Sequence, residues 1–288
     1  MYKRQGIGHV VNGSRRWISF GFISLQVSEF AKLAAVIYLA SYLDRRVNEV
    51  MTAFKGFLKP LLVLSLFSVL FLLEPDFGAT MVLSLTFLGV LFLARVPLSS
   101  FFLVFTVVLV LAVLLVVLSP YRMARLTTFV NPWQTQYGSG YQLTQSLIAF
   151  GRGGVFGVGL GNSVQKLFYL PEAHTDFLFA VIAEELGLIG ELLVLLLFVL
   201  LVVRLFVLAQ RALNDGKLFV AYMAYGFSLW LSLQVLVNIG VNAGVLPTKG
   251  LTLPFISYGG SSILVNCIIM GLMLRASHEL SLKAWGRD

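Results

Sequence analysis

The sequence predicts an all-α polytopic membrane protein with about seven membrane-spanning helices and one long extracytoplasmic loop. Hydrophobic residues make up 58% of the 288 residues and charged residues 12%, whereas about a quarter of the residues of a soluble domain are charged. The mean hydropathy is +0.90. Apolar stretches about 20 residues long recur without the alternation of a barrel strand, which favours helices. A soluble, secreted or nucleic-acid-binding protein is excluded, and no nucleic acid is expected as a partner.

The net charge of +8 would point to an acidic partner in a soluble protein. In a membrane protein, part of such a charge marks the cytoplasmic loops. Cys267 is the single cysteine and lies in an apolar run, so an intrachain disulfide is excluded. Met1 opens a polar segment without the apolar region of a signal peptide. We therefore expect either that later helices direct insertion or that the chain is a fragment.

The beginning of the chain combines a polar segment with a first span. Residues 1–25 are polar with interleaved aromatic residues and are expected on the membrane surface. Residues 26–43 form the first span, in which Glu29 and Lys32 share one helical face. This pair can neutralise itself within a helix bundle. The basic loop 44–59 is assigned to the cytoplasm, because loops on that side carry an excess of Lys and Arg.

Two further spans form a helical hairpin, and a third follows it. Residues 60–73 and 79–94 are apolar, and the turn between them, which contains Asp76, is expected outside the membrane. Residues 101–118 are almost entirely Val, Leu and Phe. This composition is typical of a helix that faces lipid.

Residues 119–175 form the large extracytoplasmic loop. They are rich in Gly, Gln, Asn and Tyr, and loops of this length are usually functional or disordered. The apolar and aromatic residues among them favour an ordered cap on the membrane. Within it, residues 141–150 have the pattern of a short amphipathic helix, with Gln142 on its polar side.

The last part of the chain holds three spans around an irregular segment. Residues 177–209 and 218–241 are long apolar stretches. Residues 243–262 contain two prolines and several glycines at membrane depth, which indicates a broken or re-entrant segment. The last span is residues 263–275. An odd number of spans places the two ends of the chain on opposite sides of the membrane.

The outer segments carry almost as many cations as the inner loops, against the usual bias. One explanation is an anionic partner outside, and the phosphate or pyrophosphate of a lipid-linked substrate is the natural choice. The alternative is that long loops are translocated regardless of their charge. The outer cations are Lys3, Arg4, Arg15, Arg16, Arg122, Arg125, Arg152, Lys166 and Lys249.

The acidic stretch 169–187 is the strongest candidate for a functional site, because charges this close to membrane segments are costly. Asp176 lies where the outer loop enters a helix. It can act as a general base or a metal-binding carboxylate with a pKa tuned by an apolar wall, or simply as a helix N-cap. His174 and Glu172 are near enough to assist it, or serve only to solvate the loop.

Other polar residues near the membrane also have a structural interpretation. Glu29 with Lys32, and Asp76 at its turn, could equally be structural, because intramembrane ion pairs often hold helices together. The structural interpretation comes first for Glu184, Glu185 and Glu191. The glycines between residues 151 and 161 follow no predicted strand and precede no GK[ST] sequence, so a nucleotide-binding loop is disfavoured. Tight turns are the simpler explanation for these glycines.

Several stretches together resemble one family. They read NGSRRWI, SEFAKL, LLEPDFGAT, GSGYQLTQSLIAFGRGG, LGNSVQKLFYLPEAHTDFLFAVIAEELG and LPTKGLTLPFISYGGSS. From about residue 6 to the C-terminal tail they are similar to the SEDS proteins (shape, elongation, division and sporulation), and to the members that act in cell division most closely. The resemblance implies a membrane glycosyltransferase that polymerises lipid II, the undecaprenyl-pyrophosphate-linked disaccharide-peptide, into glycan strands.

The resemblance also implies roles for individual residues. Asp176 matches the essential aspartate of the family, which is proposed to deprotonate the acceptor 4-hydroxyl. Glu29, Lys32 and Asp76 match further polar positions of importance. Candidate contacts to pyrophosphate or sugar are Lys249, Arg152, Lys166, Glu172, His174 and Gln142. A divalent cation, Mg²⁺ or Mn²⁺, is a candidate cofactor with Asp176 as a ligand, and no organic cofactor is expected.

The implied setting is the bacterial inner membrane at the division septum. The implied partners are a class B penicillin-binding protein, other division proteins and membrane lipids. Residues 1–288 are expected to form a single SEDS-type domain that lacks about three N-terminal helices of the ten-helix fold. Two other functions remain open, namely a lipid II flippase and a non-catalytic scaffold for the penicillin-binding protein.

Overall fold

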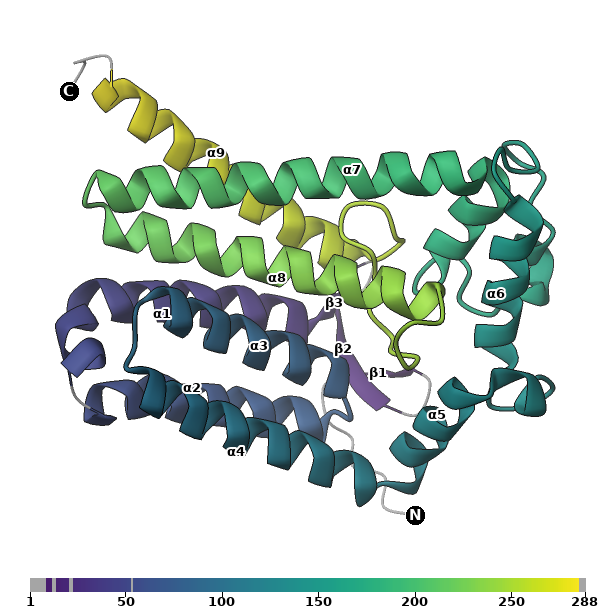
Figure 1. The fold of residues 1–288 in the computed structure, drawn as a ribbon, viewed down its shortest axis with the longest axis horizontal. Coiled ribbons are helices and arrows are strands. Elements are labelled where there is room, and N and C mark those ends of the chain that lie inside the picture. The colour runs from purple at the N-terminus through teal and green to yellow at the C-terminus, as the bar shows by residue number, and fades with distance from the viewer. Residues whose placement is uncertain (1–8, 12–13, 21–22, 53, 285–288) are drawn as a thin grey trace. The chain divides into compact units, whose positions relative to one another are not determined.

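The computed structural model describes residues 9–11, 14–20, 23–52 and 54–284 (Figure 1). The chain divides into two compact units. Unit 1 consists of Met1–Ser100, Leu205–Trp230 and Gly259–Asp288, and unit 2 consists of Phe101–Arg204 and Leu231–Tyr258. The expectation that residues 1–288 form one domain stays a prediction.

Unit 1 begins with a small antiparallel sheet of order β1-β2-β3. Its strands are β1 (His9–Val11), β2 (Ser14–Phe20) and β3 (Ile23–Gln26), and Trp17 of β2 pairs with Gln26 of β3. This segment is predicted to lie on the membrane surface, and no strands are predicted in it. The β-branched and aromatic residues of β2 favour an extended backbone, and the sheet is an addition to an otherwise helical protein.

The seven predicted spans each correspond to a long helix. These helices are α1 (Val27–Thr52), α2 (Phe54–Leu73), α3 (Phe77–Leu93), α4 (Leu98–Val117), α7 (Leu178–Asn214), α8 (Leu218–Asn242) and α9 (Gly260–Ala284). In the described part of the chain, five helices are long and apolar enough to cross a membrane, namely α2, α4, α7, α8 and α9. The multi-pass architecture is confirmed. The count of seven stays a prediction, because α3 has only 17 residues and α1 falls outside the five.

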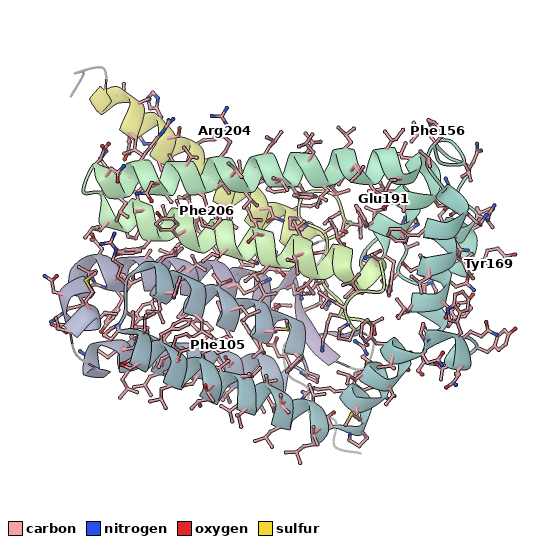
Figure 2. The ribbon with its side chains drawn as sticks, viewed as in Figure 1. Phe105, Phe156, Tyr169, Glu191, Arg204 and Phe206 are labelled. Atoms are coloured by element: carbon pink, nitrogen blue, oxygen red, sulfur yellow. The ribbon has the colours of Figure 1, made fainter. Side chains whose placement is uncertain are left out.

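Two helices of similar length differ sharply in burial. In the most apolar 18-residue stretch of each helix, 6% of the residues of α4 are buried, whereas 72% of those of α8 are. The exposed apolar side chains of α4, of which Figure 2 labels Phe105, suit a helix that faces lipid, as predicted. Helix α8 is instead mostly buried, so the polar residues on it must find partners inside the protein.

The long outer loop of unit 2 is ordered, as predicted. It contains α5 (Pro120–Val130), a 3-10 turn (Pro132–Thr135), α6 (Tyr141–Gly153) and a π-helical turn (Gln165–Tyr169). Helix α6 confirms the predicted amphipathic helix. Its Phe150 packs on a core made by Phe179, Phe198, Val235 and Leu253.

Helix α7 is broken at Gly187, which has φ 63° and ψ −165°. The sequence predicted one long span here and gave no sign of the break. The glycine-rich segment 154–159 bonds to the backbone on both sides of it. The bonds run from Leu188 N to Gly154 O (2.9 Å), Ile189 N to Val155 O (3.3 Å), Val158 N to Glu184 O (3.0 Å) and Gly159 N to Glu185 O (3.0 Å).

Glycine is required where this segment meets the helix. A Cβ added to Gly157 would lie 2.1 Å from the carbonyl oxygen of Glu185, and one added to Gly187 would lie 2.4 Å from the amide nitrogen of Gly157. These glycines therefore serve close backbone approach as well as turning. Phe156 of the same segment is exposed (Figure 2).

Candidate functional site

Asp176 lies in unit 2, in the turn that leads into α7, and the backbone around it is held in place by other segments. Three successive carbonyl oxygens, those of residues 174–176, accept hydrogen bonds from α8 and from the segment that follows it. The donors are Tyr258 N to His174 O (2.9 Å), Ser257 Oγ to Thr175 O (2.6 Å), Asn238 Nδ2 to Asp176 O (3.0 Å) and Asn242 Nδ2 to Asp176 O (2.9 Å).

The segment that follows α8 is irregular from residue 243 to residue 259, which confirms the predicted broken segment. It brings Gly250 against the carboxylate of Asp176. A Cβ added to Gly250 would lie 3.0 Å from Asp176 Oδ2. Lys249 directly precedes Gly250, so the segment that carries this predicted cation passes the half-buried carboxylate.

Lys249 belongs to a group of cations in unit 2. Burial, and then the positive charges of Arg125 and Arg122, lower the pKa of Lys249 from 10.5 to about 8. Arg125 Nη1 also donates to Thr248 O at 3.2 Å, which fixes its guanidinium beside the lysine segment. Like charges held together in partial burial favour the binding of an anion.

The alternative interpretation of Asp176 as the N-cap of α7 stays a prediction. Helix α7 begins at Leu178. The amide of Ala180, in the first turn, donates to Asn242 Oδ1 at 3.0 Å. The side chain of Asn242 is thus one acceptor at the start of this helix.

Arg152 and Lys166 pair with carboxylates of α7. Arg152 Nη1 lies 3.1 Å from Glu184 Oε1, and Lys166 Nζ lies 2.6 Å from Glu185 Oε1. The side chain of Glu184 is fully buried and also accepts hydrogen bonds from Ser163 Oγ and two backbone amides. The structural interpretation of these glutamates agrees with the contacts. The role of Arg152 and Lys166 in pyrophosphate binding stays a prediction.

The other predicted substrate contacts also lie in unit 2. Glu172 is exposed, has φ 58° and accepts a 2.8 Å hydrogen bond from Thr175 Oγ1. His174 is exposed, and Gln142 is half-buried on α6. Their contacts to a substrate stay predictions. Of the predicted outer cations, Lys3 and Arg4 lie outside the described residues.

The polar membrane positions lie in unit 1. Lys32 Nζ is 2.8 Å from Glu29 Oε1 and 4.7 Å from the ring centre of Trp230, and its side chain is 1% exposed. The predicted self-neutralising pair is confirmed. Asp76 caps α3 by accepting from Ala79 N at 3.0 Å, which supports the structural interpretation of this residue.

The described residues include no group of three His, Cys, Asp or Glu side chains that could hold a metal ion. A Mg²⁺ or Mn²⁺ ion at Asp176 would draw most of its oxygen ligands from substrate phosphates and water, as Mg²⁺ sites commonly do. The divalent cation stays a prediction.

The sequence-based prediction does not include three residues that hold the backbone at Asp176, namely Asn238, Asn242 and Ser257. The sequence contains one signal for the two asparagines. Gln234, Asn238 and Asn242 recur at every fourth position of an otherwise apolar helix, which places them on one face. Neutral amides carry no charge, so a prediction based on ionisable residues does not include them.

Comparison with known proteins shows which family the chain belongs to. Residues 1–282 match the model of the FtsW, RodA and SpoVE family, described as cell cycle protein. The chain belongs to this family of multi-pass membrane proteins, as the resemblance to SEDS proteins implied.

Individual relatives are similar over most of the chain. The protein named probable peptidoglycan glycosyltransferase FtsW of Coxiella burnetii is 64% identical over 95% of this chain and 73% of its own length. The protein of the same name from Legionella pneumophila is 58% identical over 95% of this chain and 70% of its own length.

Solved structures agree with the fold. A chain from a peptidoglycan synthase complex, described for its coordination of polymerization and crosslinking, matches with a TM-score of 0.78 and 31% identity. The match covers 95% of this chain and 76% of that one. The rod shape determining protein RodA of Thermus thermophilus matches with a TM-score of 0.65 and 31% identity, over 93% of this chain and 70% of its own.

Proposed function

We propose that this chain is a peptidoglycan glycosyltransferase that polymerises lipid II into glycan strands during septal wall synthesis. The observation that carries the proposal is the half-buried Asp176 carboxylate, which lies against Gly250 in the segment that presents Lys249. The names of the relatives support the reaction class, because FtsW proteins at 52–64% identity are called probable peptidoglycan glycosyltransferases.

In this reaction Asp176 is the general base. It takes the proton of the GlcNAc 4-hydroxyl of the acceptor as that oxygen attacks C1 of the donor MurNAc. The new glycosidic C–O bond forms as the bond from C1 to the pyrophosphate oxygen breaks, and undecaprenyl pyrophosphate leaves with the electron pair. A sugar hydroxyl is a weak nucleophile at neutral pH, and a positioned base typically contributes about 10²- to 10⁴-fold.

The cations stabilise the leaving group. Arg122 and Arg125 lie close enough to Lys249 for their charges to lower its pKa, in addition to the effect of burial. Negative charge accumulates on the pyrophosphate as the C–O bond breaks, and positive groups fixed in advance stabilise this charge without reorganisation. The same charges repel one another, so a bound anion relieves their repulsion.

The setting of the reaction belongs to the proposal as well. We place the chain in the bacterial inner membrane at the division septum, with a class B penicillin-binding protein and other division proteins as partners. The matched chain from a peptidoglycan synthase complex supports a partner of the crosslinking kind. Membrane lipids surround the exposed apolar face of α4.

The test is lipid II polymerisation by the purified protein with its cognate class B penicillin-binding protein, compared with its Asp176→Ala and Asp176→Asn variants. We expect glycan strands from the parent and a loss of about 10²-fold or more in both variants. Asp215→Asn, at an exposed acid between α7 and α8, is the matched control and should retain the parent rate.

Three results would contradict the proposal, each in a different way. Equal polymer from the parent and from Asp176→Ala would remove Asp176 from the chemistry. Lipid II movement between vesicle leaflets without any polymer would identify a flippase. Binding of the penicillin-binding protein without polymer or translocation, and unchanged in every variant, would identify a scaffold.

A further inference from the structure

One face of α8 carries three buried amides in an apolar helix. The side chains of Gln234, Asn238 and Asn242 are spaced four residues apart, and these residues are 2%, 2% and 0% exposed. A buried amide destabilises a protein unless its hydrogen bonds are made. The partners of these amides therefore indicate what the face does.

Asn242 bonds to both sides of the start of α7. Its Nδ2 donates to Asp176 O at 2.9 Å, and its Oδ1 accepts from Ala180 N at 3.0 Å. One side chain thus binds the backbone of Asp176 and the first turn of the helix that follows. These two hydrogen bonds fix the orientation of the Asp176 backbone relative to the start of α7.

Asn238 bonds to the two segments that meet at the carboxylate. Its Nδ2 donates to Asp176 O at 3.0 Å and to Leu251 O at 2.6 Å. Leu251 follows Gly250, whose backbone lies against Asp176 Oδ2. The two hydrogens of one amide nitrogen therefore hold the base and the Lys249–Leu251 segment at a set separation.

We propose that Asn238 and Asn242 are positioning residues for the glycosyl transfer. They act through Asp176 and touch neither substrate. The inference rests on the proposed function, in which Asp176 is the general base. Neutral donors suit this task because they satisfy the Asp176 carbonyl without adding charge beside the carboxylate. A misplacement of about 1 Å in a reacting group can reduce a rate about 10²-fold.

The test compares Asn238→Ala with Gln234→Ala. Gln234 is equally buried on the same face, and its Nε2 donates to Thr252 O at 3.0 Å. Both variants lose a buried amide bond to the same irregular segment, and Asn238→Ala also loses the bond to the Asp176 carbonyl. We expect Asn238→Ala to lower kcat for lipid II polymerisation about 10²-fold with little change in KM, whereas Gln234→Ala keeps the parent kcat.

A third variant separates the lost hydrogen bonds from the lost volume. Asn238→Asp keeps the size of the side chain but replaces its donor by an oxygen that faces two carbonyls. We expect this variant to lose as much kcat as Asn238→Ala. A parent-like rate in Asn238→Asp would overturn the hydrogen-bonding role.

Hydrogen exchange gives a measurement that does not depend on activity. The amide of Phe177 donates to Glu172 O at 3.2 Å, and the amide of Tyr258 donates to His174 O at 2.9 Å. If Asn238 holds this turn, the peptide that covers residues 172–180 exchanges faster in Asn238→Ala and unchanged in Gln234→Ala. Equal exchange of this peptide in both variants would overturn the proposal.

The outcomes also distinguish the two levels of inference. If Asn238→Ala and Gln234→Ala lose kcat equally, in proportion to their loss of thermal stability, the positioning role is wrong while the proposed function stands. If the parent makes no polymer, the proposed function fails. The exchange of residues 172–180 still decides whether Asn238 holds the Asp176 turn.

Discussion

The alkaline limb of the pH profile should report the charge of Lys249. Its pKa of about 8 lies below the usual 10.5, because burial and two neighbouring arginines disfavour the ammonium form. The lysine is therefore about nine-tenths protonated at pH 7 and about half protonated at pH 8. If its charge binds the pyrophosphate, binding weakens as the pH rises through 8.

The size of the effect follows from the titration. Above its pKa the protonated fraction falls tenfold per pH unit, so kcat/KM should fall about tenfold for each unit above pH 8. In the complex, the pyrophosphate brings negative charge to the ammonium group and raises its pKa. The limb of kcat should therefore lie at higher pH than the limb of kcat/KM, because kcat reports the bound state.

Two variants test this reasoning. Lys249→Arg keeps its charge over the whole range, because the guanidinium has a pKa above about 12. Its kcat/KM should show no limb near pH 8, even though arginine geometry changes the absolute rate. Lys249→Gln should have a low kcat/KM without this limb. The assay is the initial rate of lipid II polymerisation from pH 6 to about 10 at constant ionic strength.

The reasoning would be refuted if Lys249→Arg kept the alkaline limb near pH 8. It would also be refuted if the parent showed the same limb in kcat and in kcat/KM. The first result would assign the limb to another group. The second would mean that the pyrophosphate does not approach Lys249.

Two further predictions concern packing and pairing. Gly250→Ala would place a Cβ 3.0 Å from Asp176 Oδ2, so polymerisation should fall about 10²-fold, whereas Gly260→Ala, whose Cβ would meet nothing within 4 Å, should be active. Activity from Gly250→Ala at the parent level would show that the carboxylate can move. Glu184→Gln removes a fully buried charge with several donors, so thermal unfolding should show a loss of about 3 kcal/mol or more. Glu279→Gln, in an exposed pair with Arg275, should cost less than about 1 kcal/mol, and equal losses would contradict the structural role of Glu184.

The helices could be predicted because their signal is local and long. Each predicted span corresponds to a helix, since an apolar run of this length has few alternatives in a membrane. The break in α7 could not be predicted in this way. Gly187 lies in an apolar run, and the segment that fills the break is residues 154–159, some thirty positions earlier. Only tertiary contacts reveal that these glycines belong together.

The charged residues of the site could be predicted from the sequence. Asp176 and Lys249 were identified because ionisable groups beside apolar helices are costly, and the structure brings their segments together. The same reasoning drew attention to Arg152 without showing that Glu184 already pairs with it. Asn238 and Asn242 could not be predicted in this way, because the role of a neutral amide depends on its hydrogen-bond partners.

The irregular turn at Asp176 contains backbone carbonyls that accept hydrogen bonds from side chains and amides of other segments. Backbone carbonyls beside apolar helices must be satisfied inside the protein, and those of residues 174–176 accept from amides and a hydroxyl. Every one of these donors is neutral. A lysine or arginine in their place would also satisfy the carbonyls, but it would add a charge that needs a partner of its own inside the protein. Neutral donors therefore hold the residue without adding a charge beside the carboxylate.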